Sequence, residues 1–300
     1  MRLNDILSLL KKISPKEEYE FFIVGGAVRD MLLGYEDVCN IDITVTRNFE
    51  GFVSELTKIL GIDRSNVKES LFMTATVEYE GLSIDVVTAR KENYEKPGML
   101  PAVTPSDLSD DLRRRDFTLN SIAYDIRTER MIDVLNGICD LENRVLRANR
   151  ENLFEEDPTR LFRFVKYRTR FGFTAEKGTM EQMIKSLSNK NLFKNVSKSR
   201  ISKEWLLSLK ENDSDKLIEN ISNENVFSNI FKTNVICNPR FEKIDDPFFR
   251  TVATFYDNDL ELLIEIADTL LNGLKKNKIK SIEEAKSESK EFKSELFTPA

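Results

Sequence analysis

Four short motifs in this sequence combine residue types that bind phosphate, metal ions and nucleobases. In the first, an apolar strand-like stretch that starts at Phe21 runs into Gly25 and Gly26 and then into a helical pattern. Adjacent glycines let the backbone approach an anion closely, the first turn of a helix presents unpaired N–H groups, and Arg29 adds positive charge. The motif predicts a cradle for the phosphates of a nucleotide, with a tight turn as the alternative.

The second motif places an amide and a carboxylate on one face of the next predicted strand. Asn40 and Asp42 are two residues apart, so their side chains point the same way. Carboxylates on such a face can hold Mg²⁺ for in-line phosphoryl transfer. Asp85, in a second apolar run, supplies another carboxylate if its strand lies alongside. The alternative is that Asn40 and Asp42 lie on the solvated face of a strand.

The third motif is a run of three arginines that ends in Arg114 and Arg115. Guanidinium groups bind phosphate oxygens in a bidentate manner. Asp116 and Asn120, which follow directly, offer hydrogen-bond partners to ribose hydroxyls. The alternative is a run of arginines on the protein surface.

The fourth motif spaces Asp157, Arg160 and Arg163 three residues apart, along one face of a predicted helix. Cytosine and adenine both present an amino donor beside a ring-nitrogen acceptor, whereas uracil and guanine reverse that order. One carboxylate and one arginine would therefore accept C and A without a nucleic-acid template, each good pair contributing about 1 to 3 kcal/mol of discrimination. The alternative is that Asp157 caps a helix whose first residue is Pro158.

The absence of histidine excludes several classes of active site and metal site. None of the 300 residues is histidine, which excludes Ser-His-Asp and Cys-His mechanisms and histidine-ligated zinc. The three cysteines lie about a hundred residues apart, which fits neither a disulfide framework nor a paired-cysteine zinc site and favours a reducing compartment. A metal ion must then be held mainly by carboxylates, which favours Mg²⁺ or Mn²⁺.

Charge is unevenly distributed along the chain. The formal net charge is −6, yet residues 158–210 contain 13 lysines and arginines against three acidic residues, with several phenylalanines between them. A basic stretch with interleaved aromatic residues predicts a surface for a polyanion such as RNA. The alternative is a solvated helix face.

The hydrophobic pattern indicates the elements that position these motifs. Runs of β-branched and aromatic residues predict strands over 21–24, 41–46, 72–79, 82–87 and 121–125, with a helix over 52–60. From about residue 157 glycine and proline are sparse and a 3.6-residue period prevails. We therefore predict an α+β fold in which a mixed-sheet domain precedes an all-helical array. Residues 275–293 alternate Lys with Glu, which predicts a solvated terminal helix or a frayed end.

No targeting or membrane segment is expected. Residues 3–10 carry a helical apolar stripe followed, rather than preceded, by Lys11 and Lys12, which predicts a cytoplasmic helix and not a signal peptide. The roughly 18 consecutive apolar residues that a membrane span requires do not occur.

In this order the motifs resemble those of the bacterial-type, class II tRNA nucleotidyltransferases and their poly(A) polymerase relatives, which add CCA, or part of it, to tRNA 3′ ends. The likeness covers about residues 20–210 and is carried by Gly-Gly-Ala-Val-Arg-Asp at 25–30, Asn-Ile-Asp at 40–42, Arg-Arg-Asp-Phe-Thr-Leu-Asn at 114–120 and Glu-Asp-Pro-Thr-Arg-Leu-Phe-Arg at 156–163. Residues 196–207 are also similar to a Ser-x-x-Arg-Ile helix of that family. The resemblance implies a palm-like nucleotidyltransferase head at 1–147, a helical neck at 148–215 that selects nucleotides and binds tRNA, and a helical body with a short tail at 216–300.

The resemblance also implies roles for individual residues. The nucleotide site would comprise Gly25, Gly26, Arg29, Asp30, Arg114, Arg115, Asp116, Asn120, Asp157, Arg160, Arg163 and Lys166; the catalytic group would be Asn40, Asp42 and Asp85, with Mg²⁺ or Mn²⁺ at positions 40 and 42. Residues 88–110 are similar to a flexible loop of members that add the terminal A, which favours an A-adding or CCA-adding activity.

One position departs from the family pattern. Asn40 stands where the family has aspartate, and an amide oxygen brings no charge to Mg²⁺, so metal binding and activation of a 3′-hydroxyl should both weaken. Three explanations remain open: an engineered silent variant, a natural non-catalytic paralogue, or an active enzyme in which Asp37 or Asp85 compensates.

The sequence therefore predicts a Mg²⁺-dependent enzyme that transfers AMP or CMP from ATP or CTP to the 3′ end of tRNA. The alternatives are a tRNA-binding paralogue without chemistry and a poly(A) polymerase, which shares every motif but makes long A tails. The oligomeric state is left open.

Overall fold

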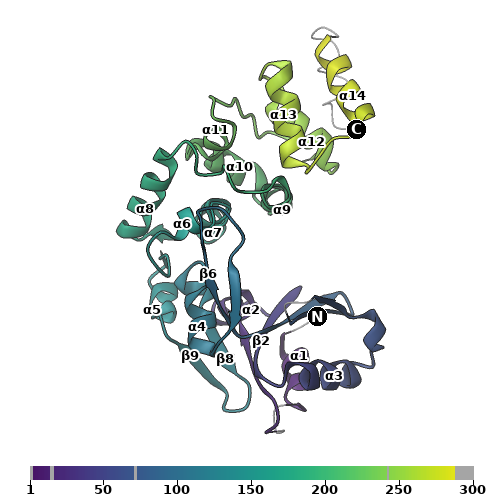
Figure 1. Cartoon of the computed structure of the whole chain (residues 1–300), viewed down its shortest axis with the longest axis vertical. Coiled ribbons are helices and arrows are strands. Elements are labelled where there is room, and N and C mark those ends of the chain that lie inside the picture. The colour runs from purple at the N-terminus through teal and green to yellow at the C-terminus, as the bar shows by residue number, and fades with distance from the viewer. Residues whose placement is uncertain (1–2, 14–16, 71–72, 242, 288–300) are drawn as a thin grey trace. The chain divides into compact units, whose positions relative to one another are not determined.

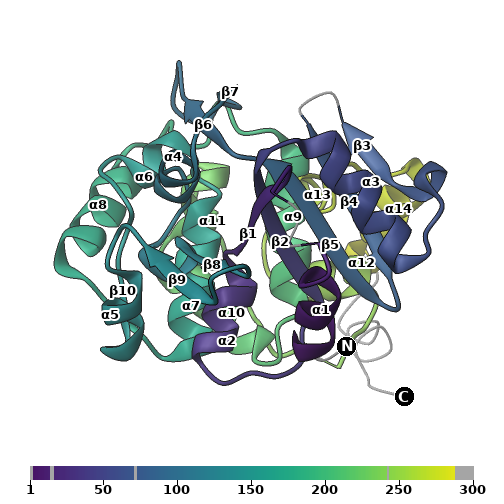
Figure 2. The ribbon, with the colours of Figure 1, turned by 90° about the horizontal axis from the view of Figure 1, so that it is seen from below.

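A computed structural model of the chain describes residues 3–13, 17–70, 73–241 and 243–287. The chain forms two compact units (Figures 1 and 2). Unit 1 comprises residues 1–95 and 101–151, and unit 2 comprises residues 96–100 and 152–300. The short segment 96–100 thus belongs to the helical unit although it interrupts unit 1 in sequence. The predicted bounds 1–147, 148–215 and 216–300 stay predictions.

Unit 1 is built on a seven-stranded mixed sheet in the order β3-β4-β5-β2-β1-β8-β9. β2 and β5 run parallel, and the other neighbouring strands run antiparallel. The strands of this sheet are β1 (Glu20–Val24), β2 (Asn40–Arg47), β3 (Lys68–Ser70), β4 (Thr74–Tyr79), β5 (Leu82–Thr88), β8 (Ile122–Asp125) and β9 (Arg130–Asp133). The predicted α+β class and mixed sheet are confirmed, although the pattern did not predict β3 or β9, and Phe72 lies outside the described residues.

The two faces of this sheet differ in chemistry because strand side chains alternate. On β2, Ile41, Ile43 and Val45 are fully or almost fully buried and join the main apolar core. That core is covered by α1 (Leu3–Leu10) and α3 (Phe49–Leu60), which lie side by side in Figure 1. The opposite face carries only a small apolar cluster, so it is the face on which polar side chains gather.

Short helices complete unit 1. They are α2 (Gly26–Leu32), η1 (Arg64–Asn66), α4 (Leu108–Arg113), η2 (Thr118–Asn120) and α5 (Gly137–Glu142), and a short strand β10 (Val145–Leu146) follows. α3 begins after Asn48, whose side chain accepts from the Gly51 N–H, and ends at Gly61 with φ of 68°. These are typical N-cap and C-cap residues.

The segment predicted as a flexible loop contains regular structure. β6 (Arg90–Asn93) and β7 (Ala102–Pro105) pair antiparallel as a separate two-stranded hairpin, and α4 follows. The pattern missed this hairpin because its strands are mostly polar, and strand prediction depends on a buried apolar face.

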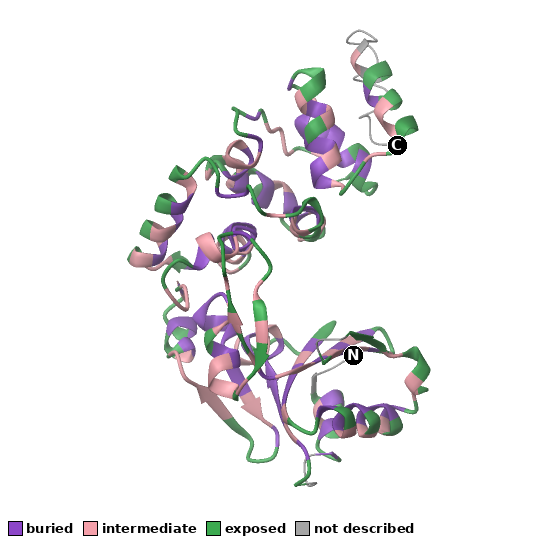
Figure 3. Ribbon diagram, in the orientation of Figure 1, coloured by how far each residue is buried: buried purple, intermediate pink, exposed green. Residues whose placement is uncertain are grey.

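Over its described residues, the part of unit 2 that follows residue 152 is helical apart from a short strand, β11 (Thr174–Ala175). Its helices are α6 (Leu153–Glu156), α7 (Arg160–Phe171), α8 (Lys177–Ser188), α9 (Lys198–Leu209), α10 (Ser214–Asn223), α11 (Val226–Phe231), α12 (Pro247–Phe255), α13 (Leu260–Leu270) and α14 (Lys276–Ser287). Buried and exposed residues alternate around α13 in Figure 3, as expected for helices packed on one face. α14 confirms the predicted terminal helix up to residue 287, and residues 288–293 lie outside the described range.

An aromatic cluster forms part of the core of unit 2. The ring of Trp205 lies 5.8 Å from that of Phe227 and 5.6 Å from that of Phe255, and its indole N–H donates to the Thr251 hydroxyl at 2.9 Å. Trp205 is fully buried, so this hydrogen bond satisfies its only polar atom. Among the described residues, no helix is long and apolar enough to cross a membrane.

Candidate active site

The glycine turn between β1 and α2 lies against two predicted site residues. Gly25 has φ of 73°, a left-handed conformation that favours glycine. A Cβ at this position would lie 2.8 Å from Nη1 of Arg115 and 3.1 Å from Oδ2 of Asp42. The backbone conformation therefore favours glycine here, a Cβ would force the Arg115 guanidinium to shift, and the turn brings an arginine and an aspartate together.

Four further predicted residues form one hydrogen-bonded network beside this turn. Arg29, which is buried, donates to Oδ1 of Asn120 at 2.7 Å and to Oδ1 of Asp30 at 2.8 Å. Asn120 in turn donates to Oδ1 of Asp116 at 2.9 Å. The structure thus joins α2 to the segment around η2, while the predicted contacts of these side chains with phosphate and ribose stay predictions.

Asp42 and Asp85 are register partners on the parallel strands β2 and β5. Register partners point to the same face, and neighbouring strands lie about 4.8 Å apart. The condition set for Asp85, that its strand lie beside the Asn40–Asp42 strand, is therefore met. Burial raises the pKa of Asp42, and the nearby carboxylates of Asp85 and Asp111 add to this, while Arg115 opposes it.

The donor set around Asp42 fits one hard cation. Within the described ranges, no group of three or more His, Cys, Asp or Glu side chains is placed to hold a metal ion. Mg²⁺ in nucleotide-processing sites is often held by only one or two protein carboxylates, with water and substrate phosphates completing the shell. Asp42 and Asp85 supply two carboxylates, and Asn40, which is exposed at the start of β2, adds an uncharged oxygen.

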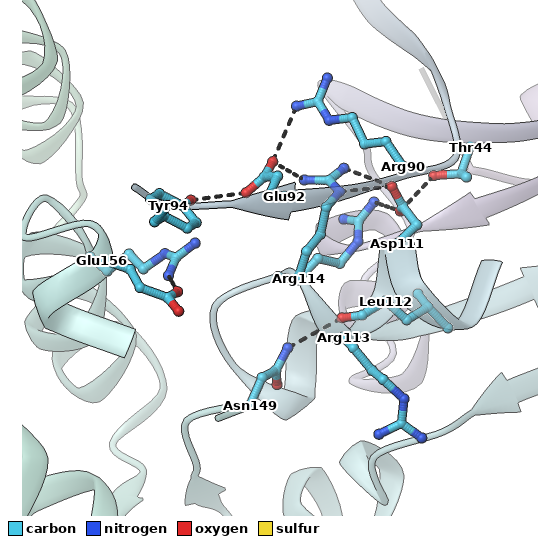
Figure 4. A network of polar contacts seen from close by, with 12 residues as sticks. Thr44, Arg90, Glu92, Tyr94, Asp111, Leu112, Arg113, Arg114, Asn149 and Glu156 are labelled. Atoms are coloured by element: carbon cyan, nitrogen blue, oxygen red, sulfur yellow. Dashed lines mark hydrogen bonds and ion pairs between the residues drawn. The ribbon is translucent and has the colours of Figure 1, made fainter. Parts of the chain in front are cut away.

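Asp111 was not among the site residues predicted from the sequence. It is completely buried in α4 and accepts hydrogen bonds from Arg114 at 2.9 Å, Arg115 at 3.1 Å and the Thr44 hydroxyl at 3.1 Å (Figure 4). Burial opposes its ionisation, but the two arginines outweigh burial and lower the pKa of Asp111. Its spacing of three and four residues from the arginines was the available signal.

Glu92 on β6 was also missed. Its side chain is 8% exposed and accepts from Arg114 at 2.9 Å, from the Tyr94 hydroxyl at 2.9 Å and from Arg90 at 3.4 Å (Figure 4). Nothing in the sequence pattern pointed to Glu92, because a glutamate in a polar segment cannot be told from a solvent-exposed surface residue.

In unit 2, Asp157 lies in a turn and not on the helix. α6 ends before it and α7 begins at Arg160, so the prediction that Pro158 opens the helix is wrong. Oδ1 of Asp157 accepts from the Thr159 backbone N–H at 3.0 Å and from its hydroxyl at 2.5 Å, and it pairs with Nη2 of Arg200 at 2.7 Å. These contacts all fall on Oδ1, which leaves Oδ2 as an acceptor. Burial opposes ionisation, yet Arg160, Thr159 and Arg200 together lower the pKa of Asp157.

Arg200 also holds the tip of the segment between β6 and β7. Its Nη1 donates to the Gly98 carbonyl at 2.6 Å, while the Gly98 N–H donates to the carbonyls of Glu155 and Glu156, each at 3.2 Å. Arg200 therefore links Gly98 to Asp157 within unit 2. It lies in the Ser-x-x-Arg-Ile stretch noted in the sequence, where no role was assigned to it.

The three basic residues predicted along α7 do share one face of the helix. Arg160 is buried and donates to the Leu153 carbonyl at 3.1 Å and to Glu156 at 3.2 Å. Nε of Arg163 lies 3.9 Å from the Glu204 carboxylate of α9. Burial lowers the pKa of Lys166 and raises that of Glu204. These charged side chains of α7 and α9 are thus largely buried, and their role in base selection stays a prediction.

A mixed sheet with a glycine turn, paired aspartates and an arginine against that turn defines a nucleotidyltransferase-type head. Residues 21–147 match the family described as the Poly A polymerase head domain. Together with the relatives below, this match shows that residues 21–147 form a head domain of the Poly A polymerase type, similar to the corresponding part of tRNA nucleotidyltransferases.

Curated relatives cover the head and part of the helical region. An A-adding tRNA nucleotidyltransferase of Halalkalibacterium halodurans is 36% identical over 219 residues, which is 70% of this chain and 50% of that protein. One of Aquifex aeolicus is 36% identical over 194 residues, 64% of this chain and 23% of that protein. A CC-adding tRNA nucleotidyltransferase of Deinococcus radiodurans is 38% identical over 172 residues, 56% of this chain and 44% of that protein. The chain thus spans a quarter to half of these relatives.

Solved structures resemble the chain over almost its whole length. A tRNA nucleotidyltransferase complexed with a primer tRNA and an incoming ATP analog has a TM-score of 0.67 and 26% identity, covering 96% of this chain and 82% of that one. An apo CCA-adding enzyme has a TM-score of 0.71 at 24% identity, covering 94% of this chain and 69% of that one, and shows the fold alone.

Proposed function

We propose that this chain is a template-independent tRNA nucleotidyltransferase that adds A, C or both to the CCA end of tRNA from ATP or CTP. The observation that carries the proposal is the convergence of Asp42 and Arg115 on the Gly25 turn, with Asp85 beside Asp42. A carboxylate pair and a guanidinium around a glycine turn form a site for a metal-bound polyphosphate.

The reaction is an in-line displacement at the α-phosphorus of the nucleotide. The 3′-oxygen of the RNA forms a bond to phosphorus, the bond to the pyrophosphate oxygen breaks, and the hydroxyl proton passes to solvent. Asp42 and Asp85 would hold Mg²⁺, which when bound polarises the 3′-hydroxyl and the phosphates. Arg115 adds fixed positive charge, and the buried ion pairs around Asp111 keep that charge in place.

Base selection would fall to the turn before α7. Oδ2 of Asp157 would accept from the exocyclic amino group of C or A, and Arg160 would donate to the ring nitrogen. Uracil and guanine would place a donor against the arginine and an acceptor against the carboxylate. The contacts that fix Asp157 and Arg160 within unit 2 support this role, because selection requires a rigid pair of groups.

The basic stretch of unit 2 would hold the RNA backbone. Its lysines 177, 185, 190, 194, 198 and 203 are exposed. RNA helices are gripped mainly through phosphate and 2′-hydroxyl contacts, so exposed lysines suit this task.

The test is an extension assay with labelled ATP and CTP on three tRNAs, ending before CCA, after C and after CC. We expect incorporation that stops at the complete end. Asn40→Asp should raise the rate at least about tenfold, equal to about 1.4 kcal/mol, because it restores a charged metal ligand. Equal rates would show that position 40 is not catalytic. No incorporation by Asn40→Asp contradicts the proposal, and long A tails identify a poly(A) polymerase instead.

A second candidate is a tRNA-binding protein without chemistry. Asn40 favours it, because an amide oxygen adds no charge to the two carboxylates, Asp42 and Asp85, that would hold the metal. Turnover by the unaltered chain that is lost in Asp42→Ala discards this candidate. Tight tRNA binding without turnover by the unaltered chain, together with turnover by the Asn40→Asp variant, supports it.

A further inference from the structure

Three polar residues form a row across neighbouring strands of the sheet of unit 1. β2, β5 and β4 lie side by side in that order (Figure 2). Asp42 on β2 is the register partner of Asp85 on β5, and Asp85 is the register partner of Thr76 on β4. Register partners project from the same face of a sheet. Thr76 therefore lies on the site face, on the side of Asp85 that is away from Asp42.

A hydrogen bond from Thr76 orients the carboxylate of Asp85. The Thr76 hydroxyl donates to Oδ1 of Asp85 at 2.6 Å. This distance is typical of a hydroxyl that donates to a carboxylate, a bond about twice as strong as one between neutral groups. Over the described residues, the Asp85 carboxylate has no other hydrogen-bond partner, so Oδ2 is left as an acceptor.

Both side chains suit this arrangement for conformational reasons. The outer torsion of an aspartate is soft, so a half-buried carboxylate such as that of Asp85 can adopt several orientations unless a partner holds it. Threonine is β-branched and stiff and is favoured in strands, so the backbone of β4 fixes the position of its hydroxyl. When a hydrogen-bond partner of a metal-ligating group is removed, metal affinity or activity typically falls by about 10- to 100-fold.

Thr74 provides an internal comparison for Thr76. It lies two residues earlier on β4, so it is on the same face, and both threonines are half-buried. The Thr74 and Ser70 hydroxyls lie 2.7 Å apart and form a hydrogen bond, and the register partner of Thr74 on β5 is Val87. The two threonines thus share residue type, strand and face, and they differ in whether the hydroxyl reaches a carboxylate of the site.

We propose that Thr76 is a positioning residue of the metal site, which fixes Oδ1 of Asp85 so that Oδ2 binds a divalent cation together with Asp42. The inference rests on the proposed nucleotidyltransferase function, because that reaction requires a cation on this face. Asn40 brings no charge to the site, so metal affinity depends strongly on how the two carboxylates are oriented. Thr76 acts through Asp85 and does not itself contact the metal.

Binding of Mn²⁺ alone tests this role without any need for turnover. Free Mn²⁺ is measured by electron paramagnetic resonance, and the binding event that is lost in Asp42→Ala defines the site. Thr76→Val keeps the shape and the β-branch but removes the donor, and it should raise the Kd for Mn²⁺ about 10-fold. Thr76→Ser keeps the hydroxyl and should retain most of the affinity. Thr74→Val, the matched control, should leave the Kd unchanged.

A double-mutant cycle shows whether Thr76 acts through Asp85. Asp85→Ala removes the acceptor, so Thr76→Val should have no further effect on Mn²⁺ binding in that background, whereas a general loss of stability would add to it. If Thr76→Val does not melt cooperatively, Thr76→Ala takes its place.

The Mg²⁺ dependence of nucleotide incorporation gives a second readout. In the Asn40→Asp background, Thr76→Val should raise the Mg²⁺ concentration for half-maximal incorporation about 10-fold. The rate at saturating Mg²⁺ should change little, because the variant weakens metal binding and leaves the bound site intact.

The outcomes separate this inference from the function on which it rests. Equal Mn²⁺ affinity in Thr76→Val and Thr74→Val, or a full effect of Thr76→Val in the Asp85→Ala background, overturns the role of Thr76. Nucleotide incorporation by Asn40→Asp alongside either result leaves the nucleotidyltransferase proposal intact. An Asn40→Asp variant that neither binds Mn²⁺ nor incorporates nucleotide overturns the proposed function, and the role of Thr76 with it.

Discussion

At the scale of single residues, the site depends on groups that restrict one another. Gly25 provides space for Arg115 and Asp42, Asp111 holds both arginines, and Thr44 fixes Asp111. A substitution at any of these positions therefore acts on neighbours as well as on itself. Buried ion pairs add to this sensitivity, because removal of one partner leaves an uncompensated charge.

The substitution Gly25→Ala tests whether Gly25 provides the space that Arg115 and Asp42 occupy. The left-handed backbone alone should cost about 1–2 kcal/mol, and the contact 2.8 Å from Arg115 should in addition displace the arginine. We expect ATP binding and nucleotide incorporation to be lost. Gly34→Ala is the matched control, because Gly34 also has positive φ, 82°, but no atom lies within 4 Å of its Cβ position. It should lower the melting temperature and preserve binding, and equal loss of binding in both variants would contradict the spatial argument.

At the scale of elements, the connection from β6 to β7 is held at two points, each within its own unit. In unit 1, Glu92 anchors β6 to Arg114. In unit 2, the tip at Gly98 accepts from Arg200, which also pairs with Asp157. A segment expected to be a flexible loop thus has defined attachments, one of which reaches the carboxylate predicted to read the base.

Arg200→Met should release both partners of Arg200. We expect faster hydrogen exchange at residues 96–100 and a loss of discrimination between ATP and GTP of about 10-fold, since Asp157 loses one of the contacts that fix Oδ1. Arg168→Met removes an ion pair of the same length, 2.7 Å to Glu224, elsewhere in unit 2 and serves as the control. If discrimination between ATP and GTP falls equally in both variants, Arg200 stabilises the unit in general and has no specific effect on Asp157.

At the scale of the whole molecule, a basic helical stretch lies within a chain that is otherwise acidic. The net charge is −6, while residues 158–210 hold 13 lysines and arginines against three acids. RNA binding should therefore depend on this stretch and weaken steeply with salt, because each neutralised phosphate releases counterions.

The salt dependence of tRNA affinity tests whether the basic stretch carries RNA binding. Lys190→Ala and Lys194→Ala remove exposed charges, and each should reduce the slope of log K against log salt by about 0.7 to 0.9 if it contacts a phosphate. Lys275→Ala and Lys276→Ala, exposed in the same unit outside the basic stretch, should leave the slope unchanged. Equal effects of the two pairs would show that net charge alone governs binding.

Sequence patterns were enough to predict the α+β class, the five main strands of the head and the residues at the glycine turn. These features depend on local patterns: a strand with one buried face alternates, and a turn with positive φ favours glycine. Asp42 and Asp85 could be named for the same reason, since each lies in a short apolar run.

The partners of these side chains, by contrast, follow from contacts between distant parts of the chain. The tertiary structure gave Arg114 and Arg115 different sets of partners, brought in Asp111 and Glu92, and moved Asp157 off the helix into a turn held by Arg200. Residues 92 and 114, or 157 and 200, lie far apart in the chain, and no local preference encodes such pairs. Their contacts arise from the packing of whole elements, and the electrostatics of the site follow from those contacts.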